Sequence, residues 1–568
     1  MMNYERLTQN PFYLSEGDLE WIKTTYENMS LAEKVGQLFL LTGPVTDRNY
    51  LNHITKDLQV GGLMCRPMEK EEVVETVAYL QTNSKVPMLI AANLETGGNG
   101  IVKQGTKVGS QMAVAATGDT KYAYELGQIC ALEAKSVGAN YAFAPVVDID
   151  YNFRNPITNT RTYGSDDKTV LAMASAYIKG CQSENVCVSI KHFPGDGVDE
   201  RDQHLLTSIN DMTCSEWDKS YGVIYKTLIE EGAKTVMVGH IMQPQYSKFL
   251  NPDLKDEEIL PASLSKELLG GLLRDRLGFN GLIITDATTM AGMNIPMRRD
   301  LLVPYSIAAG CDMFLFTKNL EEDYQFMLEG VHSGVISPQR LEEAVVRILA
   351  LKASIKLHVS ATIPKLEDAQ KILSSEHAKQ IAREVSDKSI TLVKNLDHIL
   401  PLDKKTIRNI LVYEIESGEN ALGYGREVGT ADKLIGLLQQ EGIHAVKFVP
   451  GERLEGKQPS YMELVEEYDL MLYIANIATK SNQTTVRIEW MNPMGINCPI
   501  YINAVPTIFV SVENPYHLLD VPRIRTFINC YGSNEDTLEL LIDKLFGRSE
   551  FTGISPVDPF CGKWDTRR

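Results

Sequence analysis

Residues 281–286 read Gly-Leu-Ile-Ile-Thr-Asp, an aliphatic and β-branched run that stops at a carboxylate. Short apolar runs of this kind are typical of strands that are buried on both faces. The run at 186–192 has the same form and ends in a Lys-His pair. A polar residue at such a strand end indicates a function, because packing alone favours another aliphatic side chain there.

Eight such runs occur in the first 350 residues, with amphipathic segments between them. They lie at 37–42, 62–65, 88–93, 141–145, 186–192, 235–240, 282–286 and 312–317. The segment 71–80 has one apolar helical face, and Ser30 with Glu33 forms a capping-box pair at the start of another helix. This alternation predicts an α/β fold, a (β/α)8 barrel of the TIM type, whose catalytic groups gather at the C-terminal ends of the strands. A doubly wound open sheet is the alternative.

A second alternation follows a polar segment at 359–371. Its apolar runs lie at 390–394, 409–415, 445–449, 470–475, 507–513 and 526–531. They predict a smaller α/β sandwich, as expected for a 568-residue chain that exceeds the reach of one hydrophobic core. We predict a barrel domain over 1–355, a linker and connecting helix over 356–388, and the sandwich domain over 389–568.

The charge balance argues against several classes of partner. The chain has 56 Lys and Arg against 74 Asp and Glu, a formal net charge of -18, so we expect no nucleic acid or anionic membrane as a partner. We find no signal-type segment and no run long enough to span a bilayer, and we therefore expect a cytoplasmic protein. The nine scattered cysteines fit reduced thiols. Because zinc-type spacings and phosphate loops are missing from the sequence, we expect no metal and no cofactor.

The stretch from Lys191 to Gly197 reads Lys-His-Phe-Pro-Gly-Asp-Gly and continues to an Asp202-Gln203-His204 triplet. The strand end delivers two donors, and the Pro and Gly residues then release the chain into a loop. In that loop Asp202 is placed to accept the imidazole N–H of His204, which fixes the tautomer that a general acid/base requires. A solvated Asp-rich turn with an incidental histidine is the alternative.

An ionised carboxylate at the end of an apolar strand is costly unless it is paired. We expect Lys191 and Arg161 to supply the cations for Asp286. Glycosyl transfer with retention needs a carboxylate nucleophile and a separate proton donor, and Asp286 with His204 supplies both. His240 ends another strand and is a candidate binding residue, with a buried histidine satisfied by a backbone carbonyl as the alternative.

Three motifs carry a family resemblance: Lys-His-Phe-Pro-Gly at 191–195, Asp-x-His at 202–204 and Ile-Thr-Asp at 284–286. Further similarity lies at 144–149 and 155–164, and in the second domain at 389–395, 400–402 and 510–515. With these motifs the chain resembles glycoside hydrolase family 3, and within it the two-domain β-N-acetylglucosaminidase branch.

The resemblance implies a retaining, exo-acting glycosidase that removes terminal β-N-acetylglucosamine from a small saccharide or glycoside through a covalent glycosyl-aspartate. It implies Asp286 as nucleophile, His204 as acid/base and Asp202 as the partner that orients it. The substrate-binding residues that we expect are Arg161, Lys191, His192, Asn93, Glu95 and His240.

The chain departs from the family pattern at three places. The family's Asp-x-Glu-Gly-Gly segment is here Asn-Leu-Glu-Thr-Gly-Gly at 93–98, so Asn93 puts an amide, which can also donate, in place of a carboxylate. Asp196 stands where a basic residue is common, and Gln203 stands where a small hydroxyl residue is usual. The preferred hydroxyl pattern of the sugar is therefore open.

Three alternatives for the activity remain. Glu489, in a predicted loop of the second domain, or another carboxylate of that domain is a candidate acid for a β-glucosidase-like enzyme. An imidazole acid/base such as His204 does not repel phosphate as a carboxylate does, which is compatible with a phosphorylase. A barrel that binds carbohydrate without catalysis is suggested by Asn93 and Asp196, and the intact nucleophile and acid/base residues weigh against it. The aglycone and the oligomeric state are not indicated by the sequence.

Overall fold

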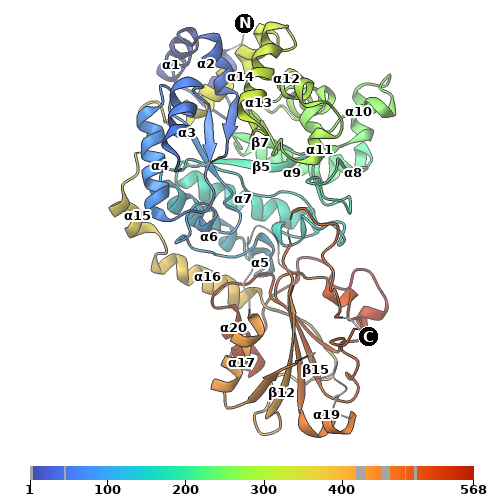
Figure 1. The fold of residues 1–568 in the computed structure, drawn as a ribbon. Helices are drawn as coiled ribbons and strands as arrows, with labels where there is room; N and C mark the ends of the chain where they lie inside the picture. The colour runs from blue at the N-terminus through green and yellow to red at the C-terminus, as the bar shows by residue number, and fades with distance from the viewer. Residues whose placement is uncertain are drawn as a thin grey trace. The chain divides into compact units, whose positions relative to one another are not determined.

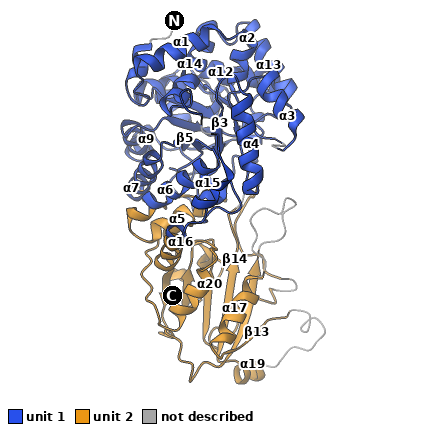
Figure 2. Ribbon diagram, turned by 90° about the vertical axis from the view of Figure 1, so that its left-hand side faces the viewer, with its two compact units in different colours: residues 1–107, 123–152, 167–379 blue, residues 108–122, 153–166, 380–568 orange. Residues whose placement is uncertain are grey.

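The computed structural model describes residues 4–43, 46–361, 363–416, 429–449, 461–479, 481–491 and 495–568. The chain forms two compact units (Figure 2). The first consists of residues 1–107, 123–152 and 167–379, and the second of residues 108–122, 153–166 and 380–568. Two segments that are early in the sequence thus belong to the second unit.

Eight parallel strands form the centre of the first unit, with helices around them (Figure 1). In spatial order they are β10 (Phe314–Leu315), β1 (Phe39–Leu41), β2 (Gly62–Met64), β3 (Leu89–Ala92), β4 (Tyr141–Ala142), β5 (Cys187–Phe193), β7 (Thr235–Val238) and β9 (Leu282–Thr285). A parallel bridge between Ile284 and Met313 joins the two ends of this order into a closed ring. Each predicted run overlaps one strand, so the barrel prediction is confirmed and the open-sheet alternative is wrong.

Helices cover the strands, whose residues are almost all buried. The longer helices are α1 (Glu16–Glu27), α4 (Lys70–Asn83), α6 (Thr120–Ser136), α7 (Asp167–Ser183), α9 (Tyr221–Glu230), α12 (Arg299–Ala309), α13 (Leu320–His332) and α14 (Pro338–Ser354). The predicted helix at 71–80 is α4, and its apolar face is buried. The predicted capping box is also present, since Ser30 and Glu33 satisfy each other's backbone N–H at the start of α2 (Leu31–Gln37).

The second unit contains a six-stranded sheet. Its strand order is β11 (Thr391–Asn395), β16 (Thr526–Asn529), β15 (Thr507–Ser511), β14 (Leu470–Asn476), β12 (Asn409–Glu416) and β13 (His444–Lys447). All neighbours are parallel except β11 and β16. One face packs on α17 (Thr430–Gln440) and α20 (Thr537–Leu545), and the other carries a row of stacked aromatic rings. The predicted α/β sandwich is confirmed.

Two very short strands that the sequence analysis did not predict bear on the site. β6 (Ser208–Ile209) and β8 (Ile241–Met242) pair in parallel as a separate two-stranded sheet. This sheet ties the loop after β5 to the segment after β7. The loop that carries the predicted acid/base is therefore anchored by backbone hydrogen bonds at its far end.

The predicted connecting segment contains α15 (Leu366–Ile372) and most of α16 (Glu376–Ser389). The boundaries 1–355, 356–388 and 389–568 stay a prediction. Within the described residues, we find no helix with the length and apolar character that crossing a membrane demands.

Candidate active site

Polar side chains meet where β5, β7 and β9 end. Asp286 follows β9, and its N–H donates to the carbonyl of Val238 at the end of β7 (2.8 Å). His192, near the end of β5, has its Nε2 3.8 Å from Asp286 Oδ2. The Nε2 of His240, which follows β7, lies 3.1 Å from the carbonyl oxygen of Ala287. The predicted strand-end residues are thus neighbours at the C-terminal end of the barrel, where such barrels hold their catalytic groups.

The Asp286 carboxylate is nearly buried, with 13% of its side chain exposed. Its Oδ1 accepts the N–H of Ala287 at 2.7 Å. Burial by itself raises the pKa of Asp286, but the charges of His192 and His204, together with the Ala287 N–H, lower it overall below the usual value. The group is therefore an ionised carboxylate, as a nucleophile requires.

Lys191 does not pair with Asp286 as the sequence analysis expected. Its Nζ lies 2.6 Å from Glu95 Oε1, and both side chains are largely buried. Asn93, directly after β3, is exposed. The positive charge near Asp286 comes from imidazoles instead. The pairing of Lys191 with Glu95 places an ammonium and a carboxylate side by side at this end of the barrel.

Asp148 is a site residue that the sequence analysis did not assign. Its Oδ2 lies 2.7 Å from Nδ1 of His192, and its Oδ1 accepts the His192 backbone N–H at 3.1 Å. Asp148 is 1% exposed. The carboxylate fixes the ring of His192 so that Nε2 faces Asp286. The available signal was a lone Asp within the apolar stretch 141–149, which begins with β4.

The predicted dyad is formed. His204 Nδ1 lies 2.6 Å from Asp202 Oδ1, and the same oxygen accepts the His204 backbone N–H at 2.8 Å. The Asp202 side chain is fully buried, whereas 26% of the His204 side chain is exposed. With Nδ1 held by a carboxylate, Nε2 is the nitrogen available for proton transfer. Asp202 and Gln203 are buried, whereas Glu200 and Arg201 in the same turn are exposed, and the role of His204 as acid/base stays a prediction.

His240 is fully buried, and both of its ring nitrogens have partners inside the protein. Nδ1 lies 2.9 Å from Ser263 Oγ, and Nε2 lies 3.1 Å from the Ala287 carbonyl. Burial lowers the pKa of His240 to about 4. The neutral ring therefore donates from Nε2 and accepts at Nδ1, which fixes the peptide next to Asp286. Its expected contact with substrate stays a prediction.

Residues 30–351 match the model of the Glycosyl hydrolase family 3 N terminal domain. The chain belongs to glycoside hydrolase family 3. It is 50% identical over 560 residues, 99% of both chains, to the Beta-N-acetylglucosaminidase/beta-glucosidase of Cellulomonas fimi. Together with the similarity to several beta-hexosaminidases, this shows that the protein is a glycosidase.

Two solved structures agree with this family 3 fold along nearly the whole chain. The Beta-glucoside phosphorylase BglX is 43% identical, with a TM-score of 0.93 and 100% of both chains covered. The family 3 beta-N-acetylglucosaminidase from Paenibacillus sp. str. FPU-7 is 25% identical, with a TM-score of 0.79 and coverage of 94% of this chain and 99% of that one. The relatives thus bear different activities on one fold.

Two candidate residues of this family 3 glycosidase lie in the second unit. Arg161 ends a short 3-10 helix (Asn159–Arg161), and its Nη1 lies 3.4 Å from the carbonyl oxygen of Ile157. Glu489 is exposed in a stretch outside helices and strands, as predicted, beside an ion pair between Arg487 and Asp520. Contact of Arg161 or Glu489 with the barrel residues stays a prediction.

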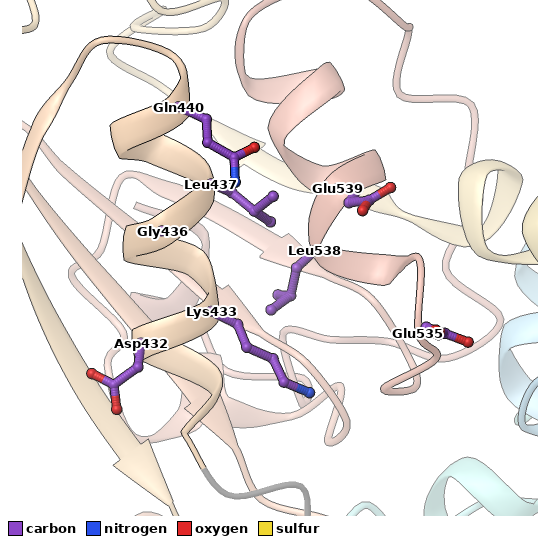
Figure 3. Close-up of a pocket in the computed structure, with 8 residues that line it drawn as sticks. All are labelled: Asp432, Lys433, Gly436, Leu437, Gln440, Glu535, Leu538 and Glu539. Carbon is purple, nitrogen blue, oxygen red and sulfur yellow. The ribbon is translucent and has the colours of Figure 1, made fainter.

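The second unit also contains a pocket of about 280 Å³ between α17 and α20 (Figure 3). Lys433 and Leu538 extend into the space between the two helices, with Glu535 and Glu539 at its edge. None of the predicted site residues lines this pocket.

Proposed function

We propose that this family 3 glycosidase is a retaining, exo-acting enzyme that removes terminal β-N-acetylglucosamine through a covalent intermediate on Asp286. The observation that carries the proposal is the pairing of two groups with complementary chemistry. Asp286 is an ionised carboxylate next to His192, and His204 is an imidazole whose Nδ1 is held by a buried carboxylate. Retaining glycosyl transfer needs one nucleophile and one proton donor of these kinds.

In the first step Oδ2 of Asp286 attacks the anomeric carbon, because Oδ1 is engaged by the Ala287 N–H. The bond from that carbon to the aglycone oxygen breaks, and Nε2 of His204 gives its proton to the departing oxygen. Asp202 stabilises the imidazolium before the transfer and keeps the ring oriented. In the second step an acceptor oxygen attacks the same carbon, its proton passes to His204, and the carboxylate of Asp286 leaves. Two inversions return the original anomeric configuration.

Glucose is the second sugar to be tested, because the full-length relative at 50% identity is named for both β-N-acetylglucosaminidase and β-glucosidase activity. The replacement of the family's strand-end Asp by Asn93 also alters the hydrogen-bonding groups offered to the sugar. Activity with aryl β-glucosides therefore belongs in the same panel as aryl β-N-acetylglucosaminides.

Phosphorolysis is the second candidate for the reaction, and two observations favour it. An imidazole in place of a carboxylate base adds no negative charge that would repel phosphate. The solved structure that covers this whole chain at 43% identity is named a beta-glucoside phosphorylase. In that reaction phosphate takes the place of water in the second step, and the product is a sugar 1-phosphate.

A panel of aryl β-glycosides, run with and without phosphate and followed by NMR, tests both parts of the proposal. Retention predicts that the sugar released in water appears first as the β-anomer. A sugar 1-phosphate formed only with added phosphate assigns phosphorolysis. The α-anomer as first product contradicts the covalent mechanism, and failure to cleave any member of the panel contradicts the substrate class.

A further inference from the structure

Gln203 lies between the two dyad residues, but its side chain points into the protein and the residue is 1% exposed. Its Oε1 accepts the backbone N–H of His240 at 2.7 Å. Its Nε2 donates to Asp196 Oδ2 at 3.3 Å. The buried amide of Gln203 thus links the segment after β5 to the segment after β7.

The contact with Asp196 extends toward the nucleophile. The Asp196 backbone N–H donates to Asp148 Oδ1 at 2.8 Å. The other oxygen of Asp148 holds Nδ1 of His192, whose Nε2 faces Asp286. A continuous series of hydrogen bonds therefore runs from Gln203 to the residue beside the nucleophile.

The contact with His240 reaches the other side of the nucleophile. His240 donates from Nε2 to the carbonyl of Ala287, the residue after Asp286. Gln203 therefore binds two groups, Asp196 and His240, each of which leads to a neighbour of Asp286. The acid/base loop and the nucleophile are held in one frame of hydrogen bonds.

The backbone around Gln203 is also packed closely against α11 (Ala291–Asn294). The carbonyl of Gln203 accepts the N–H of Gly292 at 3.2 Å, and the carbonyl of His204 accepts the N–H of Ala291 at 3.1 Å. A Cβ at position 292 would lie 2.5 Å from the Gln203 carbonyl oxygen, so the approach requires glycine. These backbone contacts hold the loop after β5 in place. The hydrogen bonds of the Gln203 side chain hold the Asp202–His204 turn, which orients the imidazole.

We propose that Gln203 is a positioning residue, which holds the Asp202–His204 turn so that Nε2 of His204 can protonate the leaving group. This inference rests on the proposed function, in which His204 is the proton donor. A smaller side chain at 203 removes the bridge between Asp196 and His240. The imidazole of His204 is then no longer held in one orientation, and proton transfer to the leaving group becomes slower.

The test compares two aryl β-N-acetylglucosaminides, or the glucosides if those are the better substrates. A phenyl leaving group depends on protonation, whereas a 2,4-dinitrophenyl group departs without it. We expect Gln203→Ala to lower kcat/KM for the phenyl substrate by about 30-fold or more, and for the dinitrophenyl substrate by less than about 3-fold, because proton transfer contributes roughly 10² to 10⁴ in rate. His204→Ala should show the same selectivity with a larger loss.

Two further variants make the comparison decisive. Gln203→Met keeps the volume and removes both hydrogen bonds, so it replaces the alanine variant if that one does not fold. Gln81→Ala is the matched control, because Gln81 is also a buried glutamine that bridges backbone groups, accepting from the Met88 N–H at 3.1 Å and donating to the Met88 carbonyl at 3.0 Å. It should lower thermal stability and leave the ratio between the two substrates unchanged.

Equal losses on both substrates in the Gln203 variants, or wild-type rates on both, overturn the positioning role. If His204→Ala shows the selective loss and the Gln203 variants do not, the proposed function stands and this inference falls. If His204→Ala itself shows no dependence on the leaving group, the acid/base assignment falls and takes this inference with it.

Discussion

Two buried aspartates at opposite ends of neighbouring strands show how one barrel uses the same side chain in two ways. Asp312 precedes β10 and forms ion pairs with Arg274 at 2.7 Å, with Arg347 at 3.4 Å, and with Arg340. Asp286 follows β9, and its Oδ2 lies 3.8 Å from Nε2 of His192. In both cases burial opposes ionisation, and nearby positive charge outweighs it, so that the pKa is lowered.

The difference lies in the partners. Guanidinium groups stay charged and occupy the oxygens of Asp312, which fixes that carboxylate as part of the barrel's N-terminal end. Imidazoles at a longer distance keep Asp286 ionised but leave Oδ2 free to react. In the proposed mechanism Asp286 is the reacting group, and we expect Asp312 to contribute stability, because barrels of this type hold their catalytic groups at the C-terminal ends of the strands.

The largest expected effect separates the two aspartates by activity. Asp286→Ala should lower kcat on aryl β-glycosides by on the order of 10⁴-fold or more, because the proposed mechanism forms its covalent intermediate on Asp286. Its free energy of unfolding should change little or rise, since an active-site charge is removed. Steady-state kinetics and urea denaturation measure the two quantities. Turnover within tenfold of wild type would remove Asp286 from the mechanism.

The second prediction concerns Asp312, whose replacement should lower stability and leave activity nearly unchanged. Asp312→Ala leaves Arg274, Arg340 and Arg347 without their shared carboxylate, and breaking a buried pair in this way costs about 3 to 5 kcal/mol of unfolding free energy. The kcat of the folded fraction should stay close to wild type. If the variant is as stable as wild type but inactive, the assignment of roles to the two ends of the barrel is wrong.

A smaller effect is expected in the pH dependence of the free energy of unfolding. His240 has its pKa lowered to about 4 by burial, against about 6.5 in an unfolded chain. Between these values the unfolded state binds a proton that the folded state does not, so stability falls as pH is lowered from about 6.5 to about 4. His240→Gln should flatten this dependence by at most about 3 kcal/mol. Unfolding free energies measured across that range provide the test.

His332→Gln is the control for this measurement, because His332 is exposed on α13. It should follow the wild-type pH dependence. An unchanged slope in His240→Gln would mean that His240 is not the group that is held neutral in the folded barrel.

The strands of both units could be predicted because parallel strands that are buried on both faces have continuous apolar sequences. The missed strands β6 and β8 have two residues each, and unlike the equally short β4 and β10 they do not lie within longer apolar runs. They matter nonetheless, since they tie the acid/base loop to the segment after β7.

The site was predictable where geometry is local. Asp202 and His204 are two residues apart, so their contact follows from the chain itself, and Asp286 stands at a strand end that the barrel rule singles out. The pairing of Lys191 with Glu95 and the bridge made by Gln203 join different strands. Such contacts depend on strand order and side-chain direction in three dimensions, and no sequence spacing encodes them.

The central claim is that Asp286 becomes covalently joined to the sugar, and trapping with a slow fluorinated glycoside tests it most directly. Peptide mass spectrometry after inactivation should find one sugar, on the peptide that contains Asp286, and none on Asp312. The Asp286→Ala variant should take up no label. A sugar on any other side chain, or inversion at the anomeric carbon of the released product, would contradict the account.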